Sequence, residues 1–390
     1  MTTAPRILDI VNTDHAALHF LAYRVRWINR HTEFENDIIC SPGPHLSRIG
    51  LPPSRITTMD IPRGMSPRSL AVFLLRLTRH LRAKPYTIVH THNSITGAIG
   101  RVAARIARIP LTIHTTHGFH FHENMGRMRS LPFIAAERAL SRCCDVLLCQ
   151  NREELDLVPR LRLQPHLGVH HVGNGIDLRF FPARTTEPNN PRPVILFVGR
   201  LEPVKNQMML LRALPLLRDL NPIVQLVGDG PSRAEYEAEL RQLGLTDSVQ
   251  FLGYRYDVPE LTAAADVVVL TSLKEGIPRA LMQASAVGVP VVATDVKGSR
   301  EVIVDGQTGF LVQLGDFHTL AKRLASLLQD RALRRDMSLR AMTHARQQFD
   351  EERVVERLVQ LYREALLARG LAEAAEPALI EPVRVGQGRA

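Results

Sequence analysis

One segment in the second half of the chain carries side chains suited to binding a phosphorylated ligand. Gly199 and Arg200 follow the apolar run VILFV, and Lys205 stands five positions beyond the arginine. Glycine permits a sharp turn at a strand end, and an arginine fork with a lysine point charge suits a diphosphate. An ordinary solvated loop is the competing interpretation of these residues alone.

A second segment, EGIP at residues 275–278, lies between the run DVVVLTS and the apolar stretch RALMQASAVGVP. Pro278 favours a helix start, and unpaired N–H groups near Ala280 and Leu281 would bind phosphate oxygens. Glu275 is placed to accept hydrogen bonds from sugar hydroxyls, and Gln283, about two turns into the helix, from a ribose. The alternatives are a carboxylate that stabilises a helix N-terminus and a surface glutamine.

A histidine-rich segment, HTTHGFHFH, begins at His114. Strand alternation sends His114 and His117 to opposite faces, and no acidic residue or cysteine completes a regular metal-ligand set. We therefore expect no metal and no other cofactor. His117, on a loop with Gly118 as its pivot, suits hydrogen bonding to a reacting group, although a strand-end histidine satisfied by its neighbours is the alternative.

These residues must be positioned by the ends of strands, and the hydrophobic pattern predicts such strands. Short β-branched runs alternate with amphipathic stretches, which is typical of βαβ units and parallel sheets. The expected strands are 7–11, 37–40, 87–92, 111–116 and 145–149, then 194–198, 223–227, 249–252, 266–270, 290–293 and 309–312. Ser66 and Pro67 predict a helix start, and Arg101, Arg105 and Arg108 predict a basic side on the next helix.

The polar stretch TTEPNNPRP at residues 185–193 cannot hold a helix or a central strand and marks a domain boundary. We expect an α/β protein with two tandem doubly wound, Rossmann-like domains, residues 1–188 and 189–350, and a ligand site in the cleft between them. A helix at residues 351–369 is expected to pack back toward the first domain. Residues 370–390 are expected to be disordered.

Composition narrows the class of protein. The chain has 390 residues, 45% of them hydrophobic. No apolar run approaches the roughly 20 residues of a membrane span, and the first 20 residues lack a signal-peptide pattern, so we expect a cytoplasmic protein. The four cysteines show no C-x-x-C spacing and are interpreted as reduced core residues.

The net charge of +10 comes from residues 1–188, where lysine and arginine outnumber acidic residues 24 to 14. Such asymmetry indicates an anionic partner: a phospholipid surface, a lipid diphosphate or a nucleic acid. An arginine-favouring codon bias without any partner is an equally simple explanation.

Taken together, these segments resemble the retaining GT-B glycosyltransferases known as glycosyltransferase family four, up to about Arg369. The second half carries the motifs NGIDLRFF, VGRLEPVKN, LVGDGPSR, VQFLGYRYDV, DVVVLTSLKEGIPRALMQASAVGVPVVAT and DGQTGFLV in the family's order and spacing. In the first half DIPRGMSP, IVHTHNSITGAIGRVAAR and THGFHF resemble the branch that builds bacterial surface polysaccharides.

The resemblance implies a hexosyltransferase that moves a sugar from a nucleotide diphosphate, such as UDP, to a glycan or lipid-linked saccharide, with the first domain binding the acceptor and the second the donor. It implies that Arg200 and Lys205 hold the diphosphate, and that His117 lies beside the anomeric centre. The remaining implied donor residues are Gly199, Glu275, Gly276, Ile277, Pro278, Ala280, Leu281 and Gln283. The family is thought to retain configuration by front-side attack and normally needs no metal.

Two positions depart from the family pattern. The second of two glutamates separated by seven residues is Gln283, a neutral acceptor where an ionised one makes the stronger bond, so the family pattern does not settle the affinity for the donor or the donor's identity. The glycine-rich loop after the first strand is replaced by TDHAA at residues 13–17. Asp14, His15, Phe119 and His120 are the candidate acceptor-binding residues.

Other functions fit parts of this pattern. A nucleotide-sugar epimerase or hydrolase could use the same architecture, because a fold does not fix a function. A nucleic-acid-binding protein fits the charge, but the sequence lacks the stacking aromatics and motifs of that class, so we expect no nucleic-acid partner. The basic helices and Phe119, Phe121, Met125 and Met128 near Arg127 and Arg129 lead to the hypothesis of peripheral attachment to an anionic membrane.

Overall fold

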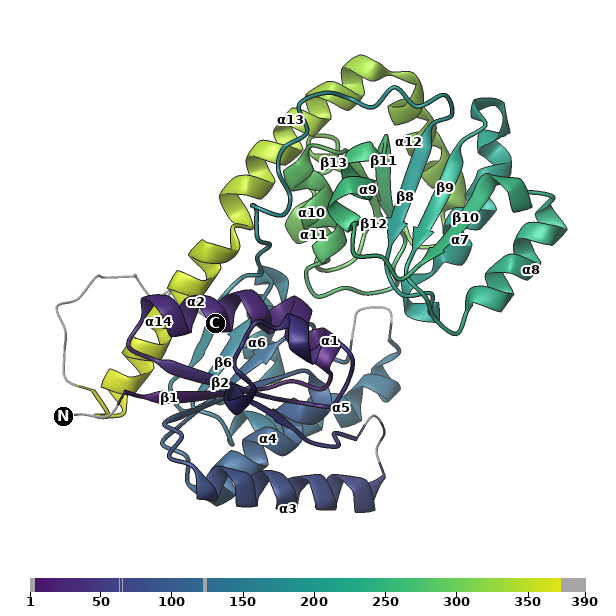
Figure 1. The fold of residues 1–390 in the computed structure, drawn as a ribbon. Coiled ribbons are helices and arrows are strands. Elements are labelled where there is room, and N and C mark those ends of the chain that lie inside the picture. The colour runs from purple at the N-terminus through teal and green to yellow at the C-terminus, as the bar shows by residue number, and fades with distance from the viewer. Residues whose placement is uncertain (1–3, 63, 65, 122–124, 373–390) are drawn as a thin grey trace, which may run out of the picture.

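The computed structural model describes residues 4–62, 64, 66–121 and 125–372, which form two lobes, each built on a parallel sheet (Figure 1). The predicted fold class is confirmed: helices flank both sheets. The disordered tail expected at residues 370–390 falls almost wholly on residues 373–390, which lie outside the described residues.

The first sheet has the order β3-β2-β1-β4-β5-β6-β7. Its strands are β1 (Arg6–Ile10), β2 (Glu35–Cys40), β3 (Ile56–Thr58), β4 (Ile88–His92), β5 (Leu111–Thr116), β6 (Val146–Cys149) and β7 (Val169–His171). The sequence did not predict β3 and β7, because three residues at a sheet edge are too few to establish an alternation.

The second sheet has the order β10-β9-β8-β11-β12-β13. Its strands are β8 (Val194–Val198), β9 (Ile223–Val227), β10 (Val249–Gly253), β11 (Val267–Leu270), β12 (Val291–Thr294) and β13 (Gly309–Val312). The six expected strands are all present within one residue at either end. Their near-continuous valine, isoleucine and leucine content reflects burial on both faces, as in other parallel sheets.

Each sheet has one point where the strand order reverses, between β1 and β4 in the first and between β8 and β11 in the second. A crevice opens at such a point beyond the carboxyl ends of the strands. The loop after β5 contacts the loop after β11, since a side chain at Gly118 would meet the backbone of Gly276. The carboxyl edges of the two sheets therefore face each other, and the candidate site lies between them.

The helices of the first lobe are α1 (Asp14–Ala16), α2 (Ala22–His31), α3 (Pro67–Ala83), α4 (Ser94–Ala107), α5 (Arg127–Ser141) and α6 (Arg152–Leu161). Those of the second are α7 (Gln207–Ala213), α8 (Arg233–Leu243), α9 (Val258–Ala264), α10 (Arg279–Val287), α11 (Ser299–Val302), α12 (Phe317–Gln329) and α13 (Arg331–Gln348). None of the helices in these described segments is long and apolar enough to cross a bilayer.

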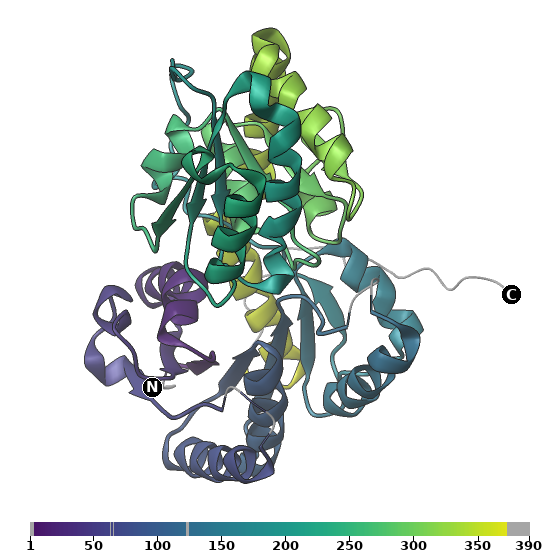
Figure 2. The ribbon, with the colours of Figure 1, turned by 90° about the vertical axis from the view of Figure 1, so that its right-hand side faces the viewer.

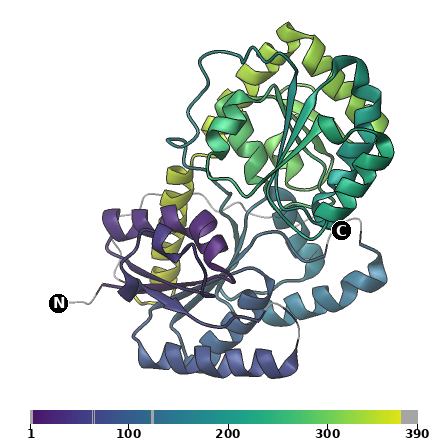
Figure 3. The same ribbon diagram turned by 45° about the vertical axis from the view of Figure 1, so that its right-hand side comes forward.

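The chain crosses between the lobes twice, and the last helix, α14 (Glu351–Ala368), belongs to the first lobe. The two crossings meet where Ile176 pairs with Asp350. Beyond that point α14 buries Val355, Leu358 and Tyr362 in one cluster with residues of β1 and β4. Figures 2 and 3 show the yellow helix ending against the first sheet.

The basic side predicted for α4 needs a correction. Arg101 is 1% exposed, and its guanidinium donates to Glu137 on α5 over 2.6 Å and 3.2 Å. A pairing of this kind across two helices cannot be read from the periodicity of one of them. Arg101 therefore holds α4 against α5 and adds nothing to a basic surface. Ser66 does precede α3, but its side chain makes no capping hydrogen bond.

Candidate active site

Two residues predicted to bind the donor, Lys205 and Glu275, meet at the carboxyl edge of the second sheet. Lys205 Nζ donates to Glu275 Oε1 over 2.6 Å, and the side chains are 23% and 10% exposed. Ser272 Oγ donates to the same carboxylate oxygen over 2.6 Å. The carboxylate is thus fixed by two donors, one of them cationic.

Backbone contacts hold the two loops that carry this pair. The N–H of Leu273 donates to the carbonyl of Val204 over 2.8 Å, and Thr271 Oγ1 donates to the carbonyl of Asn206 over 2.7 Å. The loop after β8 is therefore attached to the loop after β11 on both sides of Lys205. A ligand that binds between them meets a preformed arrangement.

Arg200 lies at the outer edge of the site. Its side chain is 68% exposed, and Nε lies 3.3 Å from an oxygen of Glu202. Gly199, just before it, donates its N–H to the carbonyl of Val227 over 2.9 Å, which ends β8. Arg200 is free to turn toward an anion in the cleft, because an exposed pair of this kind contributes little to stability.

The N-terminus of α10 supports part of the predicted phosphate site. Pro278 is the N-cap residue, and the N–H groups of Arg279 and Ala280 fall in the first turn, where a helix supplies no backbone partners. The prediction for Leu281 is wrong in its reason: its N–H donates to the carbonyl of Pro278 over 3.1 Å, and its side chain is buried. Gln283 is half-buried on α10.

Two glycines face each other where the lobes touch. A methyl group added to Gly276 would lie 2.6 Å from the backbone oxygen of His117, and one added to Gly118 would lie 3.3 Å from the Cα of Gly276. Asn151 Nδ2 donates to the Gly276 carbonyl over 3.1 Å, and Asn174 Nδ2 to the carbonyl of Ile277 over 3.3 Å. The EGIP loop is therefore held from the first lobe.

These two asparagines were not predicted. Asn151 is the N-cap of α6 and reads from the sequence as an ordinary turn residue. Asn174 follows β7 and begins the motif NGIDLRFF, but the motif alone assigns it no partner. Their role depends on a contact between lobes that local patterns do not encode.

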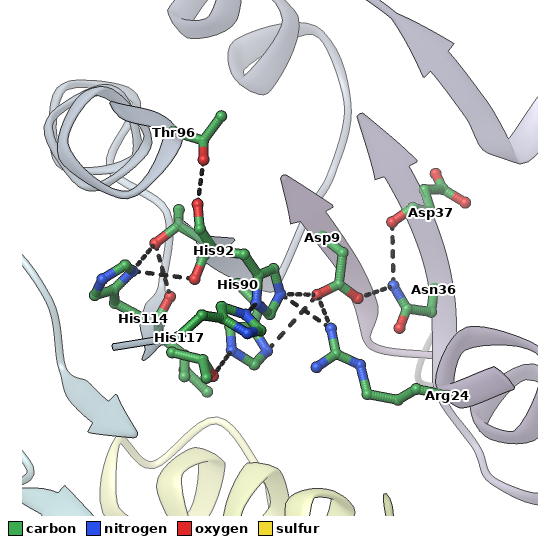
Figure 4. Close-up of polar contacts among 12 residues, drawn as sticks. Asp9, Arg24, Asn36, Asp37, His90, His92, Thr96, His114 and His117 are labelled. Carbon is green, nitrogen blue, oxygen red and sulfur yellow. Dashed lines mark hydrogen bonds and ion pairs between the residues drawn. The ribbon is translucent and has the colours of Figure 1, made fainter. Parts of the chain in front are cut away.

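The His117 ring lies among polar side chains of the first lobe (Figure 4). Its Nε2 lies 3.0 Å from His92 Nδ1, and His92 Nε2 lies 2.7 Å from Asp9 Oδ1. Asp9 and His92 are fully buried, and Arg24 forms an ion pair with the same Asp9 oxygen. The backbone of His117 lies at the contact between lobes, while its ring belongs to a buried polar network.

The charges of this network follow from its surroundings. Burial raises the pKa of Asp9, but Arg24 and the hydrogen bonds from His92 and Asn36 outweigh it, so the pKa is lowered. Burial lowers the pKa of His92. Burial, followed by His92 and Arg24, holds the pKa of His117 well below its ordinary value. At neutral pH the network holds an ionised carboxylate, a guanidinium and neutral imidazoles.

In the described part of the chain, one group of residues has the spacing of metal ligands, namely Asp9, His90 and His92, with ligand atoms within 4.8 Å of one another. Arg24 already neutralises Asp9, and the His90 ring bonds to Tyr362 and Thr115 at 2.6 Å each. The ligand atoms that a cation would need therefore already have hydrogen-bond or ion-pair partners. A metal-free site stays a prediction.

The four candidate acceptor residues fall into different surroundings. Asp14 is buried and accepts the N–H of His45 over 2.8 Å, so it fixes the loop after β2. His15 and His120 are exposed. Phe119 is 7% exposed, stacks on Phe121 and belongs to a core cluster. Phe119 is therefore removed from the acceptor-binding residues, because strand-end geometry turned it inward.

A group of aromatic rings bridges the cleft. The sequence did not indicate that these rings lie together. His19, in the π-helical turn before α2, contacts the hydroxyl of Tyr254 after β10 over 3.1 Å. The rings of His15 and His45 each lie 5.7 Å from the Tyr254 ring. Burial lowers the pKa of His19 to about 4, and nearby His15 adds to the shift. His19 therefore presents a neutral ring to this side of the cleft.

The arrangement suits a ligand that carries an anion and hydroxyl groups. Arg200, Lys205 and the first turn of α10 present positive charge and N–H donors to one edge of the second sheet. Glu275 presents an acceptor beside them. Because Lys205 and the first turn of α10 are fixed before a ligand arrives, they can stabilise charge that develops on a departing phosphate.

Comparison with protein families gives two matches that divide the chain near its expected boundary. The glycosyltransferase family 4 model matches residues 30–180, and the model of glycosyl transferases group 1 matches residues 182–344.

Among characterised relatives, UDP-Gal:alpha-D-GlcNAc-diphosphoundecaprenol alpha-1,3-galactosyltransferase of Escherichia coli is 30% identical over 275 residues, which cover 67% of this chain and 71% of that protein. D-inositol 3-phosphate glycosyltransferase of Salinispora arenicola is 31% identical over 363 residues, covering 84% and 80%. In fold, the chain is similar to the Anabaena protein HepE in complex with UDP and glucose, with a TM-score of 0.77 at 20% identity over 92% of this chain and 100% of that one.

Proposed function

The chain belongs to the group 1 and family 4 glycosyltransferases, and from this membership we propose that it transfers a hexose from a UDP-sugar to a lipid-linked saccharide with retention of configuration. The observation that carries the proposal is the Lys205–Glu275 pair at the switch point of the second sheet, next to Gly276, which lies against the His117 backbone. The E. coli relative uses UDP-Gal and a diphosphoundecaprenol acceptor by its name.

In this proposal each part of the site acts on one part of the donor. Lys205 and Arg200 hold the diphosphate, and the N–H groups of Arg279 and Ala280 bind its oxygens. Glu275, released from Lys205 when the diphosphate arrives, accepts hydrogen bonds from the sugar. Front-side attack lets the departing phosphate take the acceptor proton, so we assign no carboxylate nucleophile and no metal.

The proposal is tested by measuring release of nucleotide diphosphate from UDP-, GDP- and ADP-sugars with and without a diphosphate-linked saccharide acceptor. Acceptor-dependent release of UDP and an α-linked product from an α-configured donor are expected. Release that needs no acceptor would instead indicate a hydrolase, and a β-linked product would contradict retention. EDTA is expected to leave the rate unchanged.

We further propose that the first lobe attaches to an anionic membrane through α3 and α5. Met128, Leu131 and Phe133 on α5 are 81%, 54% and 40% exposed, and Arg129 stands among them. On α3, Leu75 is 71% exposed. Apolar side chains beside arginines suit a headgroup interface.

A basic surface pocket beside α3 supports this attachment. It has a volume of about 510 Å³ and is lined by Arg76, Arg79 and His80 on the helix, by Thr58 at the end of β3, and by Asp60, which pairs with Arg76. Cations concentrated next to exposed apolar side chains favour lipid phosphates over bulk anions.

Vesicle co-sedimentation at low salt tests the attachment. Wild-type protein is expected to pellet with vesicles of 30% phosphatidylglycerol and to remain in solution with neutral vesicles. Replacing Met128, Leu131 and Phe133 by serine is expected to abolish pelleting. The matched control replaces Leu216 and Leu339, which are 51% and 52% exposed on the second lobe. Equal loss in both variants would contradict the assignment.

A further inference from the structure

The buried network behind His117 forms a row of hydrogen-bonded side chains that leads from Asp9 through His92 to His117. Ordinary core packing does not require such a row. Strand register pairs Asp9 on β1 with His90 on β4, and His92 follows on the same face of β4 two residues later. Next to β4, β5 ends immediately before His117. Three neighbouring strands therefore align a carboxylate, an imidazole and a second imidazole toward the contact between lobes (Figure 4).

The protons in this chain of contacts can be placed from the donors and acceptors alone. Asp9 Oδ1 and His92 Nε2 lie 2.7 Å apart, and two lone pairs at that distance would repel, so the proton is on His92 Nε2. His92 is neutral, and its Nδ1 therefore accepts. The proton between the two rings must then come from His117 Nε2, 3.0 Å away.

Asp9 is held in the ionised form that this assignment needs. Arg24 forms an ion pair with Oδ1, and Asn36 Nδ2 donates to Oδ2 over 2.9 Å. Arg24 also lies 3.0 Å from His92 Nε2, but a guanidinium only donates, so its bond is the one to Asp9. Outside this chain of contacts, the Gln150 side chain raises the pKa of His117, against the larger effect of burial.

We propose that Asp9 and His92 are positioning residues for His117, fixing its Nε2–H tautomer and ring orientation behind the donor sugar. This inference rests on the proposed function and on the place beside the anomeric centre that the family resemblance implies for His117. A side chain that two other residues hold in place samples fewer unproductive orientations when a ligand binds. Asp9 would thus act on the reaction through His92, without touching the substrate.

His90 provides the matched comparison. It is as buried as His92 and lies on the same strand, but its ring bonds to Tyr362 on α14 and to Thr115, each at 2.6 Å, and not to His117. A purely structural network predicts similar effects of replacing either histidine. A positioning role predicts different ones.

The experiment compares Asp9→Asn, His92→Phe and His90→Phe in the full chain. Ring-nitrogen NMR of histidine-labelled protein reads the tautomer of His117, and steady-state kinetics give kcat and the KM for the UDP-sugar. His117 is expected as the Nε2–H tautomer in the wild type and in His90→Phe. In Asp9→Asn an amide N–H can face His92 Nε2, which reverses the protonation of both rings.

Asp9→Asn and His92→Phe are each expected to lower kcat by about tenfold or more, with an unchanged KM for the donor, while His90→Phe changes kcat by less than threefold. An unchanged His117 tautomer in Asp9→Asn would overturn the proposal, as would an equal loss of kcat in His90→Phe. If Asp9→Asn fails to fold, His92→Phe keeps the Asp9–Arg24 pair and gives the same comparison. A wild type without transferase activity would contradict the proposed function, and the NMR would still decide the tautomer.

Discussion

Lys205 Nζ and Glu275 Oε1 lie 2.6 Å apart, joining two loops whose residues are 70 positions apart in the chain. Both had been assigned to the donor, one to its diphosphate and one to its sugar, and in the ligand-free protein each neutralises the other. A bound diphosphate must compete for the ammonium group. The pair therefore keeps the carboxylate oriented until the donor supplies its own charge.

Replacing Lys205 by alanine should remove most of the stabilisation of the departing nucleotide. We expect kcat to fall by about 100-fold or more, the size of effect seen when one preorganised charge-stabilising donor is lost. Rates with the UDP-sugar are compared with those of Lys322→Ala, whose side chain is exposed on α12. A loss within twofold of the control would remove Lys205 from the site.

Gln283→Glu tests the departure from the family pattern. A charged acceptor makes a hydrogen bond stronger than a neutral one by about 1 kcal/mol, so the affinity for the preferred UDP-sugar should rise by about fivefold. Calorimetric titration of both proteins with UDP and with the UDP-sugar measures this. Weaker binding by the glutamate variant would show that Gln283 donates its amide hydrogens to the donor instead.

Gly276→Ala tests the contact between lobes. The new methyl group would lie 2.6 Å from the His117 backbone oxygen, which cannot move aside as a flexible side chain could. We expect the loops to separate, kcat to fall by about tenfold and the radius of gyration in solution to increase. Gly126→Ala is the control, because no atom lies within 4 Å of its new methyl group. Equal activity of the two variants would show that the contact is not needed for transfer.

Lowering the pH should destabilise the fold at pH values well above those at which carboxylates titrate. Burial lowers the pKa of His90, His92, His114 and His117. These groups stay neutral in the folded state while the unfolded chain binds protons below pH about 6.5, so their stabilisation is present above that pH and is lost as pH falls. Each histidine lowers the free energy of unfolding by up to about 1.4 kcal/mol for each pH unit of acidification.

Urea unfolding at pH 7.5, 6.5 and 5.5 measures this dependence. The free energy of unfolding is expected to fall steeply between the last two values. His90→Phe should reduce the slope of the unfolding free energy against pH by the amount expected for one proton. His318→Gln, at an exposed position, should leave this slope unchanged. A flat profile from pH 6.5 to pH 5.5 would show that the buried histidines accept protons without unfolding.

The sequence by itself determined the central strands of both sheets and the segments that hold the donor site. Strand and helix periodicities are local, because burial repeats every two or 3.6 residues within one element. The valine-rich runs and the loops that follow them were therefore located to within a residue or two. Lys205 and Glu275 could be assigned to one site because both follow strands that should end at one edge.

Only the tertiary structure decided which side chains meet. Lys205 pairs with Glu275, Arg101 is buried against Glu137, Phe119 turns into the core, and the N–H of Leu281 is already bonded. The clearest case is Asp9, an acidic residue in the apolar strand RILDI, whose partner His92 lies 83 positions away. Sheet order, set by the crossover helices, makes these strands neighbours, and no local periodicity records that order.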